Sequence, residues 1–426
     1  MKKNSTLAAI AAAMLTTSVA ATGTMAAGFR LPEAGAKAMG MGFAFTAQAD
    51  DPSAIYYNPA GITQLEGNNA MAGVTAVREN GGKFAGTTPL SGGAGITETQ
   101  KTLDFFIPNA YATHKTKGSA VAWGIGVFTP FGLGQEYKDK GTSFFRNQAT
   151  RIDLKTVVIN PTVAFKIGDA LSVGVGIDYM MGWANLEKFA VGGTGTNLAY
   201  SKLKGDGDAW GYNAGILLTP SPYWQAGFSY RSPFDLKAKD ADLTLSQNLT
   251  PFPVSSKADA VISMPATAAL GIAIRPVDRL TVEADLDWTF WSAYRELNVV
   301  NRTVPQLSST PTGRNKQWND VCAVRVGTEY KVTDPLALRL GFAYDPTPAP
   351  FETTGAELPD ANRLNYMVGA GYKIGPLTLD ASYFYLQKKN RTLNNVRLEE
   401  NGNPIGMNGM WKGTAHLVSL DLGYRF

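Results

Sequence analysis

Few side chains in this sequence are of the types that carry out nucleophilic or metal chemistry. It contains two histidines, His114 and His416, and one cysteine, Cys322, and these residues are far apart in the chain. A metal site or a Cys/His catalytic pair needs several such groups together. We therefore expect no metal, no cofactor and no enzymatic activity, with carboxylate-based chemistry as the one catalytic alternative left open. A single cysteine also allows no intramolecular disulfide.

Basic side chains are better candidates for binding than for catalysis. Arg325 and Arg339 occupy polar positions of alternating segments, and three further cations, Arg151, Lys188 and Lys316, lie near expected strand ends or loop bases. A cation at such a position can hold the carboxylate of a ligand. The polar positions also carry six acidic residues, Glu283, Asp285, Asp287, Glu329, Asp380 and Asp421. Pairing between acidic and basic side chains of the protein itself is therefore the alternative role.

The elements that position these residues are predicted to be strands. From Leu280 to Phe290 apolar and polar residues alternate, and the pattern recurs at 336–344, 377–385 and 418–426. Alternation with a period of two places one set of side chains on each face of a sheet. Charged residues make up only 17% of the 426 residues, whereas they make up about a quarter of a soluble domain.

Overall hydropathy and charge exclude two broad classes of protein. A mean hydropathy of -0.10 excludes a bundle of membrane-spanning helices, which needs several apolar stretches of about 20 residues. A net charge of +4 without any block of Lys and Arg argues against nucleic-acid binding.

The first 26 residues have the features of a secretory signal peptide. Met1-Lys2-Lys3 is a short basic region, and the apolar stretch from Leu7 to Val19 is too short to span a bilayer. Thr24-Met25-Ala26 offers small residues for cleavage after Ala26. The alternative is an ordinary buried N-terminal helix. We expect an exported protein whose mature chain is Ala27–Phe426.

The alternating strands fit either a soluble β-sandwich or a membrane-spanning β-barrel. A sandwich buries its apolar face, whereas a barrel exposes that face to lipid and keeps polar groups in its lumen. Aromatic residues at the ends of the apolar stripes, such as Trp288 and Tyr344, and the terminal Tyr424-Arg425-Phe426 favour the barrel. Short turns alternate with long polar loops near 81–102, 130–149, 189–207, 237–260, 298–317, 346–362 and 391–411. This pattern predicts an all-β membrane protein, a 14-stranded antiparallel barrel over residues 67–426 in the bacterial outer membrane.

Residues 27–66 do not follow the strand pattern. Asp51-Pro52 is typical of the start of a short helix, and Asn58-Pro59-Ala60 ends it, because a residue before proline avoids the helical region. These residues predict a small hatch, or plug, inside the barrel lumen. The alternative is a periplasmic tail, which the apolar content of the segment makes less favourable.

Two segments are specific enough to suggest a family. They are Asn58-Pro59-Ala60-Gly61 and Pro265-Ala266-Thr267-Ala268-Ala269-Leu270-Gly271. Weaker matches are Ala27-Gly28-Phe29, 50–57, Tyr230-Arg231-Ser232, 288–292, 344–348 and 358–363. Together they resemble the FadL family of outer-membrane transporters for long-chain fatty acids and aromatic hydrocarbons. The resemblance covers the mature chain and implies a 14-stranded barrel with an N-terminal hatch, in agreement with the strand count.

The resemblance also implies a transport route. Family members are understood to capture an apolar ligand among the extracellular loops and to pass it to a lumenal pocket beside the hatch. The ligand then leaves sideways through the wall at a kinked third strand. Phe29 matches the hatch residue beside that pocket. The passage to the capture groove is matched by a segment that includes Phe128, Phe131 and Leu133.

The lateral gate is expected in the strand at 118–129. Gly124 and Gly126 would help this strand to bend, because glycine weakens a strand. Simple packing of both glycines against the hatch is an equal alternative.

The function predicted is passive uptake of hydrophobic compounds, with long-chain fatty acids as the cargo. Aromatic hydrocarbons are the alternative cargo, because no basic residue can be matched to those that bind a carboxylate in the family. A general hydrophilic porin is the second alternative. We expect a monomer that contacts its hydrophobic ligand and the surrounding lipid and lipopolysaccharide, and that binds no nucleic acid.

Overall fold

The computed structural model describes residues 28–191, 198–249, 253–296, 298–302, 315–396, 399–400 and 403–426. The predicted signal peptide, residues 1–26 with its cleavage site after Ala26, lies outside the described residues. Within the described ranges, no helix has both the length and the apolar character that crossing a membrane requires.

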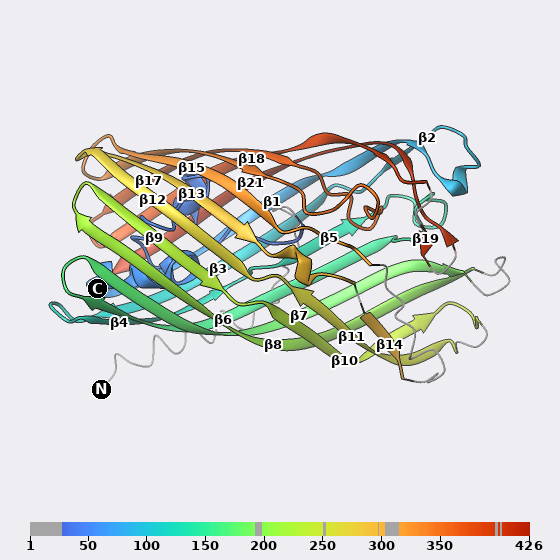
Figure 1. The fold of residues 1–426 in the computed structure, drawn as a ribbon, viewed down its shortest axis with the longest axis horizontal. Coiled ribbons are helices and arrows are strands. Elements are labelled where there is room, and N and C mark those ends of the chain that lie inside the picture. The colour runs from blue at the N-terminus through green and yellow to red at the C-terminus, as the bar shows by residue number, and fades with distance from the viewer. Residues whose placement is uncertain are drawn as a thin grey trace.

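One antiparallel sheet closes on itself to form a barrel (Figure 1). Its segments are β1 (Gly67–Thr87), β2 (Ile96–Thr99), β3 (Leu103–Lys115), β4 (Val121–Phe128), β5 (Gly132–Glu136), β6 (Arg151–Ile167), β7 (Leu171–Val191), β8 (Leu198–Ser221), β9 (Trp224–Arg231), β10 (Phe234–Leu245), β11 (Ser255–Met264), β12 (Thr267–Val277), β13 (Leu280–Thr289), β14 (Asn298–Asn301), β15 (Val321–Lys331), β16 (Leu336–Asp345), β17 (Arg363–Ile374), β18 (Leu377–Asn394) and β21 (Asn408–Arg425). The last strand, β21, pairs with β18 on one side and with β1 on the other, which closes the barrel. A separate small sheet joins β19 (Glu399–Glu400) to β20 (Asn403–Pro404).

Several barrel strands consist of two segments separated by a break. The breaks divide β4 from β5, β9 from β10, β11 from β12 and β13 from β14, while β2 prolongs β3. The 19 segments of the sheet therefore form 14 antiparallel barrel strands, as the sequence predicts.

The two faces of the barrel differ as the sequence pattern predicts. Leu340 in β16 and Leu422 in β21 point outward and are 62% and 55% exposed, whereas the adjacent Arg339 and Asp421 are buried. An apolar outer face and a polar inner face are the arrangement of a membrane-spanning barrel. The predicted fold class is therefore confirmed.

Two of the predicted long loops are much shorter than expected. The β8 strand begins inside the predicted loop 189–207, and β10 and β11 occupy most of the predicted loop 237–260. These loop boundaries were wrong because the strands carry charged residues, such as Lys237 and Lys257, on their exposed outer face. A charged outer face suits water rather than lipid, so the alternation of apolar and polar residues fades although the strands continue.

The N-terminal segment, defined here as residues 28–66, lies inside the barrel (Figure 1). It contains α2 (Ala36–Gly40), α3 (Ala54–Tyr57) and the 3-10 helix η1 (Pro59–Gln64). The Asp51 carboxylate accepts a hydrogen bond from the Ser53 N–H at 2.8 Å. The predicted helix thus begins two residues later than Pro52 and ends before Asn58.

The barrel holds this segment largely through its backbone. Four consecutive amides, at 45–48, donate hydrogen bonds of 2.6–3.0 Å to the carboxylates of Glu283 and Asp285 in β13. Glycines in the barrel wall allow the backbones to approach closely. A Cβ atom added at Gly341, for example, would lie 2.6 Å from the Cα atom of Gly42. The fit therefore depends on carboxylates and glycines of the barrel that pack against this segment.

Candidate ligand-binding site

The hydrogen-bonded wall of the barrel is interrupted between β4 and β5. Residues 129–131 leave the sheet and join the N-terminal segment, because the Leu31 N–H donates to the Pro130 carbonyl at 2.8 Å. The Gly132 N–H donates to the Phe29 carbonyl at 2.9 Å. Proline has no N–H to give to a sheet ladder and favours such a break. The interrupted strand and the N-terminal segment are thus joined through their backbones.

Beside this interruption, a stretch of β3 is paired with β1 on one side but has no ladder with β4 or β5 on the other. Pairing of β3 with β4 stops at Ala110 and Val127, and backbone contact resumes where the Lys101 N–H donates to the Glu136 carbonyl at 2.7 Å. No ladder joins the two strands between these points, all of which lie in the described part of the chain. Pro108 falls within the unpaired stretch, as expected of an edge. The backbone wall is discontinuous here.

A second interruption lies between β13 and β14. After Thr289 the chain leaves the sheet and forms the 3-10 helix η3 (Trp291–Ala293). Trp291 is fully buried against the N-terminal segment.

Both interruptions meet at Phe29. The centroid of the Phe29 ring lies 4.7 Å from that of Trp291, 5.2 Å from Tyr294, and 6.1 Å from both Phe131 and Trp318. Most of these contacts are edge-to-face, the geometry that aromatic pairs prefer. We call Phe29, Phe131, Trp291, Tyr294 and Trp318 the aromatic box. This box is the largest concentration of aromatic rings around any residue that the sequence analysis singled out.

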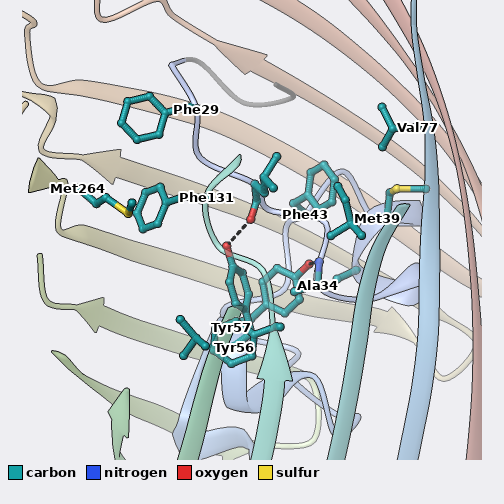
Figure 2. Close-up of a cluster of buried hydrophobic side chains, with 14 of the residues drawn as sticks. Phe29, Ala34, Met39, Phe43, Tyr56, Tyr57, Val77, Phe131 and Met264 are labelled. Atoms are coloured by element: carbon teal, nitrogen blue, oxygen red, sulfur yellow. Dashed lines mark hydrogen bonds between the residues drawn. The ribbon is translucent and has the colours of Figure 1, made fainter. Parts of the chain in front are cut away.

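The residues predicted to line the passage separate into different surroundings. Phe131 belongs to the aromatic box and lies beside Phe29 in Figure 2. Phe128 packs instead against Tyr56, with ring centroids 5.1 Å apart, and the Arg231 guanidinium lies 4.9 Å from its ring. Leu133 is buried in β5. The passage residues thus form part of the apolar core, and only one of them touches Phe29.

The predicted inward-facing arginines are buried in ion pairs. Arg325 lies 3.0 Å from Asp287 and 3.1 Å from Asp345, and Arg339 makes a similar double ion pair. Arg30 of the N-terminal segment also reaches Asp287, at 2.7 Å. These contacts fit the alternative in which the charges hold the barrel and the N-terminal segment together.

The predicted cations near strand ends have different surroundings, and Lys316 lies two residues before Trp318 of the aromatic box. Arg151 pairs with Asp153 at 2.6 Å and is partly exposed, and Lys316 pairs with Glu357 at 2.5 Å. Lys188 lies near the end of β7. Arg151 lies opposite Glu187, the neighbour of Lys188, in the ladder of β6 and β7, whereas Arg325 is buried in β15, so a shared ligand-binding role for Arg151, Lys188, Lys316 and Arg325 stays a prediction.

Gly124 and Gly126 lie before the interruption rather than in it. Both are paired within β4, and a Cβ atom added at Gly126 would lie 2.9 Å from the Ile55 side chain. Their place in the structure fits the alternative of packing against the N-terminal segment. The interruption itself begins after Phe128.

The predicted hatch motif is an anchor point. The Asn58 side-chain amide donates to the carbonyls of Thr46 at 2.7 Å and Ile216 at 3.0 Å. Pro59 and Ala60 press against the wall so closely that a Cβ atom at Gly174 would lie 2.5 Å from the Ala60 nitrogen. The motif thus ties the N-terminal segment to the barrel wall at β7 and β8.

Glu33 is the most unusual titratable group of the N-terminal segment. Its side chain is 1% exposed, and within the described residues neither of its carboxyl oxygens has a hydrogen-bond partner. Burial raises the pKa of Glu33 to about 8, because a charged carboxylate is poorly solvated there. The carboxyl group is therefore mostly protonated at neutral pH.

Sequence reasoning missed several residues of this region. Trp291, Tyr294 and Trp318 were not singled out, nor were Glu33 and Arg363 as site residues. Trp291 and Arg363 do fall in the family-like segments 288–292 and 358–363, which are not regular strands throughout. The match of these segments to the family was the sequence feature that could have pointed to both residues. Among the described residues, no group of three or more His, Cys, Asp or Glu side chains is arranged to hold a metal ion.

Comparison with known proteins identifies the family. A family model described as "Outer membrane protein transport protein (OMPP1/FadL/TodX)" matches residues 17–426. The chain belongs to this family. It is therefore an outer-membrane protein of a family that transports hydrophobic compounds, and not an enzyme.

Individual relatives of this FadL/TodX chain are distant but similar over their whole length. It is 26% identical to outer membrane protein P1 of Haemophilus influenzae over 98% of both chains. It is 24% identical to a long-chain fatty acid transport protein of Salmonella typhi, over 87% of this chain and 90% of the relative.

Two solved structures share the fold. A Pseudomonas aeruginosa FadL homologue has a TM-score of 0.80 and 22% identity, covering 94% of this chain and 100% of the other. The Ralstonia pickettii toluene transporter TbuX has a TM-score of 0.68 and 19% identity, covering 92% and 98%. At such identities the structural likeness establishes the fold alone.

Proposed function

We propose that this FadL/TodX protein takes up long-chain fatty acids passively across the outer membrane. The observation that carries the proposal is the aromatic box around Phe29, which joins the N-terminal segment to both interruptions of the barrel wall. The proposed route has three stages: capture near the extracellular loops, binding at the box, and lateral exit through the wall.

Capture is proposed at a small apolar cavity between β7, β8, β10 and β11, which must widen to admit an acyl chain. Leu186, Leu203, Leu236 and Ile262 line this cavity together with several glycines and alanines and with Asp206. An acyl chain gains about 0.8 kcal/mol for each CH₂ group moved from water into such surroundings. Apolar walls alone can therefore supply the affinity for a long tail.

Binding is proposed at the aromatic box. Phe29 and Trp291 are each at most 2% exposed, so a ligand reaches this place only by displacing a ring. Because Phe29 is followed directly by the residues that pair with 130–132, its displacement would pull on the interrupted strand. We propose that this connection links binding at the box to exit through the wall.

Lateral exit is proposed where β3 has no ladder with the neighbouring strand, between residues 103–109 of β3 and residues 128–135. Because no ladder hydrogen bonds join the strands here, a ligand can pass once the side chains move aside. We therefore propose the exit beside residues 129–131 rather than at Gly124 and Gly126.

We propose that the N-terminal segment is the hatch of this barrel. Its buried position and its bonds to Glu283 and Asp285 support a plugged lumen. A hydrophilic porin, the second alternative, needs an open aqueous lumen. Aromatic hydrocarbons remain the alternative cargo, since aromatic rings also pack favourably on one another.

Uptake measurements test the proposal. Cells that lack their own fatty-acid transporter and express this chain should accumulate labelled oleate faster than cells carrying an empty vector. A parallel measurement with labelled toluene separates the two cargoes, since toluene uptake without oleate uptake would overturn the fatty-acid assignment. A large steady ion current through the purified wild-type protein in a planar bilayer would instead support the porin alternative.

A further inference from the structure

Three lysines gather on the outer face of the barrel, on the neighbouring strands β18, β21 and β1. Lys83 in β1 lies directly opposite Lys412 in β21, and a bulge in β18 places Lys389 beside Lys412 as well. All three side chains are exposed, whereas the adjacent Trp411 points inward and is buried. The Lys389 ammonium lies 5.5 Å from the centre of the Tyr344 ring. We call Lys83, Lys389 and Lys412 the lysine strip.

The chain does not compensate the charge of the lysine strip. Like charges that face each other across a ladder destabilise a sheet. Elsewhere on the outer face opposite charges are paired instead: Lys257 lies 2.5 Å from Asp242, and Arg78 lies 3.4 Å from Asp104. Over the described part of the chain, none of the three ammonium groups of the strip forms an ion pair with a carboxylate.

The acidic residues nearest to the lysine strip are engaged elsewhere. Glu79 is buried and pairs with Lys388 at 3.0 Å. Glu98 accepts a hydrogen bond from a backbone N–H in the loop after β5, and Glu136 pairs with Lys101 at 2.7 Å. The acidic β19 belongs to a separate small sheet beyond the ladder of β18 and β21. The strip therefore keeps its three positive charges.

An aromatic row crosses the same side of the barrel between the lysine strip and the short turns. Phe342, Tyr366, Tyr385 and His416 are direct partners in successive ladders of β16, β17, β18 and β21. Neighbouring ring centroids in this row lie 5.3–6.5 Å apart. Aromatic rings on the outer face of a membrane barrel mark the boundary between acyl chains and head groups. Leu340, nearer to the short turns, is exposed on the same face and suits contact with acyl chains.

The position of the lysine strip indicates which head groups it meets. From the C-terminal end of the barrel, β18, β21 and β1 run side by side towards the opposite end, which carries the longer loops (Figure 1). In bacterial barrels the short turns lie in the periplasm and the longer loops outside the cell. The strip therefore faces the outer leaflet. Lipopolysaccharide is the main lipid of that leaflet in an outer membrane, and its lipid A part carries phosphate groups above several acyl chains.

We propose that the lysine strip binds the phosphate groups of a lipopolysaccharide molecule whose acyl chains lie against the aromatic row. The ammonium groups donate charge-assisted hydrogen bonds to phosphate oxygens, and the added negative charge relieves the repulsion between Lys83 and Lys412. Basic clusters beside a lipid-facing surface recognise phosphorylated head groups in this way. The proposal does not depend on the cargo. It gives the barrel a fixed lipid partner on one side of its outer face.

Binding of defined lipids to the purified full chain, measured by native mass spectrometry, tests the proposal. The probe is lipid A with both phosphates, compared with dephosphorylated lipid A and with phosphatidylglycerol. We expect the double variant Lys83→Gln, Lys412→Gln to bind phosphorylated lipid A about 25-fold more weakly than the wild type, because each lysine beside an anionic lipid surface contributes about fivefold. The matched control is Lys204→Gln, Lys237→Gln, because these outer-face lysines lie opposite aspartates, and it should bind as the wild type does.

Each outcome of this experiment supports or overturns the proposal. Equal binding of phosphorylated and dephosphorylated lipid A by the wild type would overturn it, as would an equal loss of binding in the control. Phosphatidylglycerol that binds as tightly as phosphorylated lipid A would overturn the assignment to lipopolysaccharide. Binding should persist in EDTA, since a loss would indicate bridging by divalent cations instead of direct contact with lysines. If the double variant does not fold, as judged by heat-modifiable gel migration, Lys389→Gln alone should still bind about fivefold more weakly.

Discussion

The substitution Gly227→Ala should dislodge the N-terminal segment from the barrel. Gly227 lies in β9, and an added Cβ atom would lie 2.6 Å from the carbonyl carbon of Thr46 and 2.9 Å from the Cα atom of Ala47. Ordinary contacts of a Cβ atom begin near 3.4 Å. Both opposing atoms belong to backbone, which cannot rotate away as a side chain does. Residues 46–47 must therefore retreat by about 1 Å.

The cost of this retreat follows from what holds the segment at this point. The amides of Thr46 and Ala47 donate to Asp285 and Glu283 at 3.0 and 2.6 Å, and a shift of about 1 Å away from these carboxylates takes both beyond hydrogen-bond distance. Each hydrogen bond to a charged group is worth about 1.5–3 kcal/mol, so the two together amount to about 3–6 kcal/mol. This exceeds what a small segment can absorb without moving out of its place.

Ion conductance of single proteins in a planar bilayer measures the result. Gly423→Ala is the matched control, because the added Cβ atom in β21 would find its nearest neighbour at an ordinary 3.6 Å. We expect a steady current through Gly227→Ala and no comparable current through the wild type or the control. Heat-modifiable gel migration confirms that each barrel is folded. A folded Gly227→Ala protein that conducts no better than the control would refute the argument that this segment blocks the lumen.

Three further predictions concern the N-terminal segment. Phe29→Ala removes a ring of the aromatic box and should lower oleate uptake at least about tenfold, since apolar burial against such a ring is worth about 1.5–3 kcal/mol. Phe342→Ala, on the exposed outer face, should not lower it, and equal uptake by both variants would exclude Phe29 from the route. Glu33→Gln should change the pH dependence of unfolding by urea, measured by gel migration. Because burial raises the Glu33 pKa from 4.5 to about 8, the stability gained from the protonated carboxyl is complete below pH 4.5 and declines as pH rises towards 8, so the wild type should lose about 1.4 kcal/mol per pH unit relative to the variant in that window; a constant difference would contradict the assignment. Asn58→Ala loses the hydrogen bonds to Thr46 and Ile216, each of which stabilises the bound segment by about 1 kcal/mol. Added protease should therefore cleave the segment at lower protease concentrations than in the wild type. Unchanged protection would show that the motif is not an anchor.

The barrel follows from the sequence alone, because the pattern behind it is local. Leu340 and Leu422 alternate with Arg339 and Asp421, and in a strand that alternation decides which side faces lipid. The alternation of short turns and long loops predicts the number of strands, and the terminal aromatic residues predict the outer membrane as the compartment. Where the outer face of a strand meets water, as at Lys237 and Lys257, this local signal is lost, and the predicted loops were accordingly too long.

The candidate site could be predicted only in part. Phe29 and Phe131 are named by their segments, but Trp291, Tyr294 and Trp318 reach the same ring from breaks in other strands, far away in the sequence. These three residues reach Phe29 only because closure of the barrel brings the breaks in the different strands to the same level along the barrel axis. No periodicity within a segment contains that information.

The roles of the charged residues were likewise beyond the sequence. Alternation places Arg325 and Asp287 in the lumen, yet it cannot tell a paired arginine from one that waits for a ligand. That distinction depends on which carboxylates lie within about 3 Å across neighbouring strands. The sequence by itself determined the barrel, its orientation of faces and its family, because those depend on near neighbours in the chain. Tertiary structure decided the aromatic box, the ion pairs and the break in the wall, because each depends on distances between strands that only closure of the barrel sets.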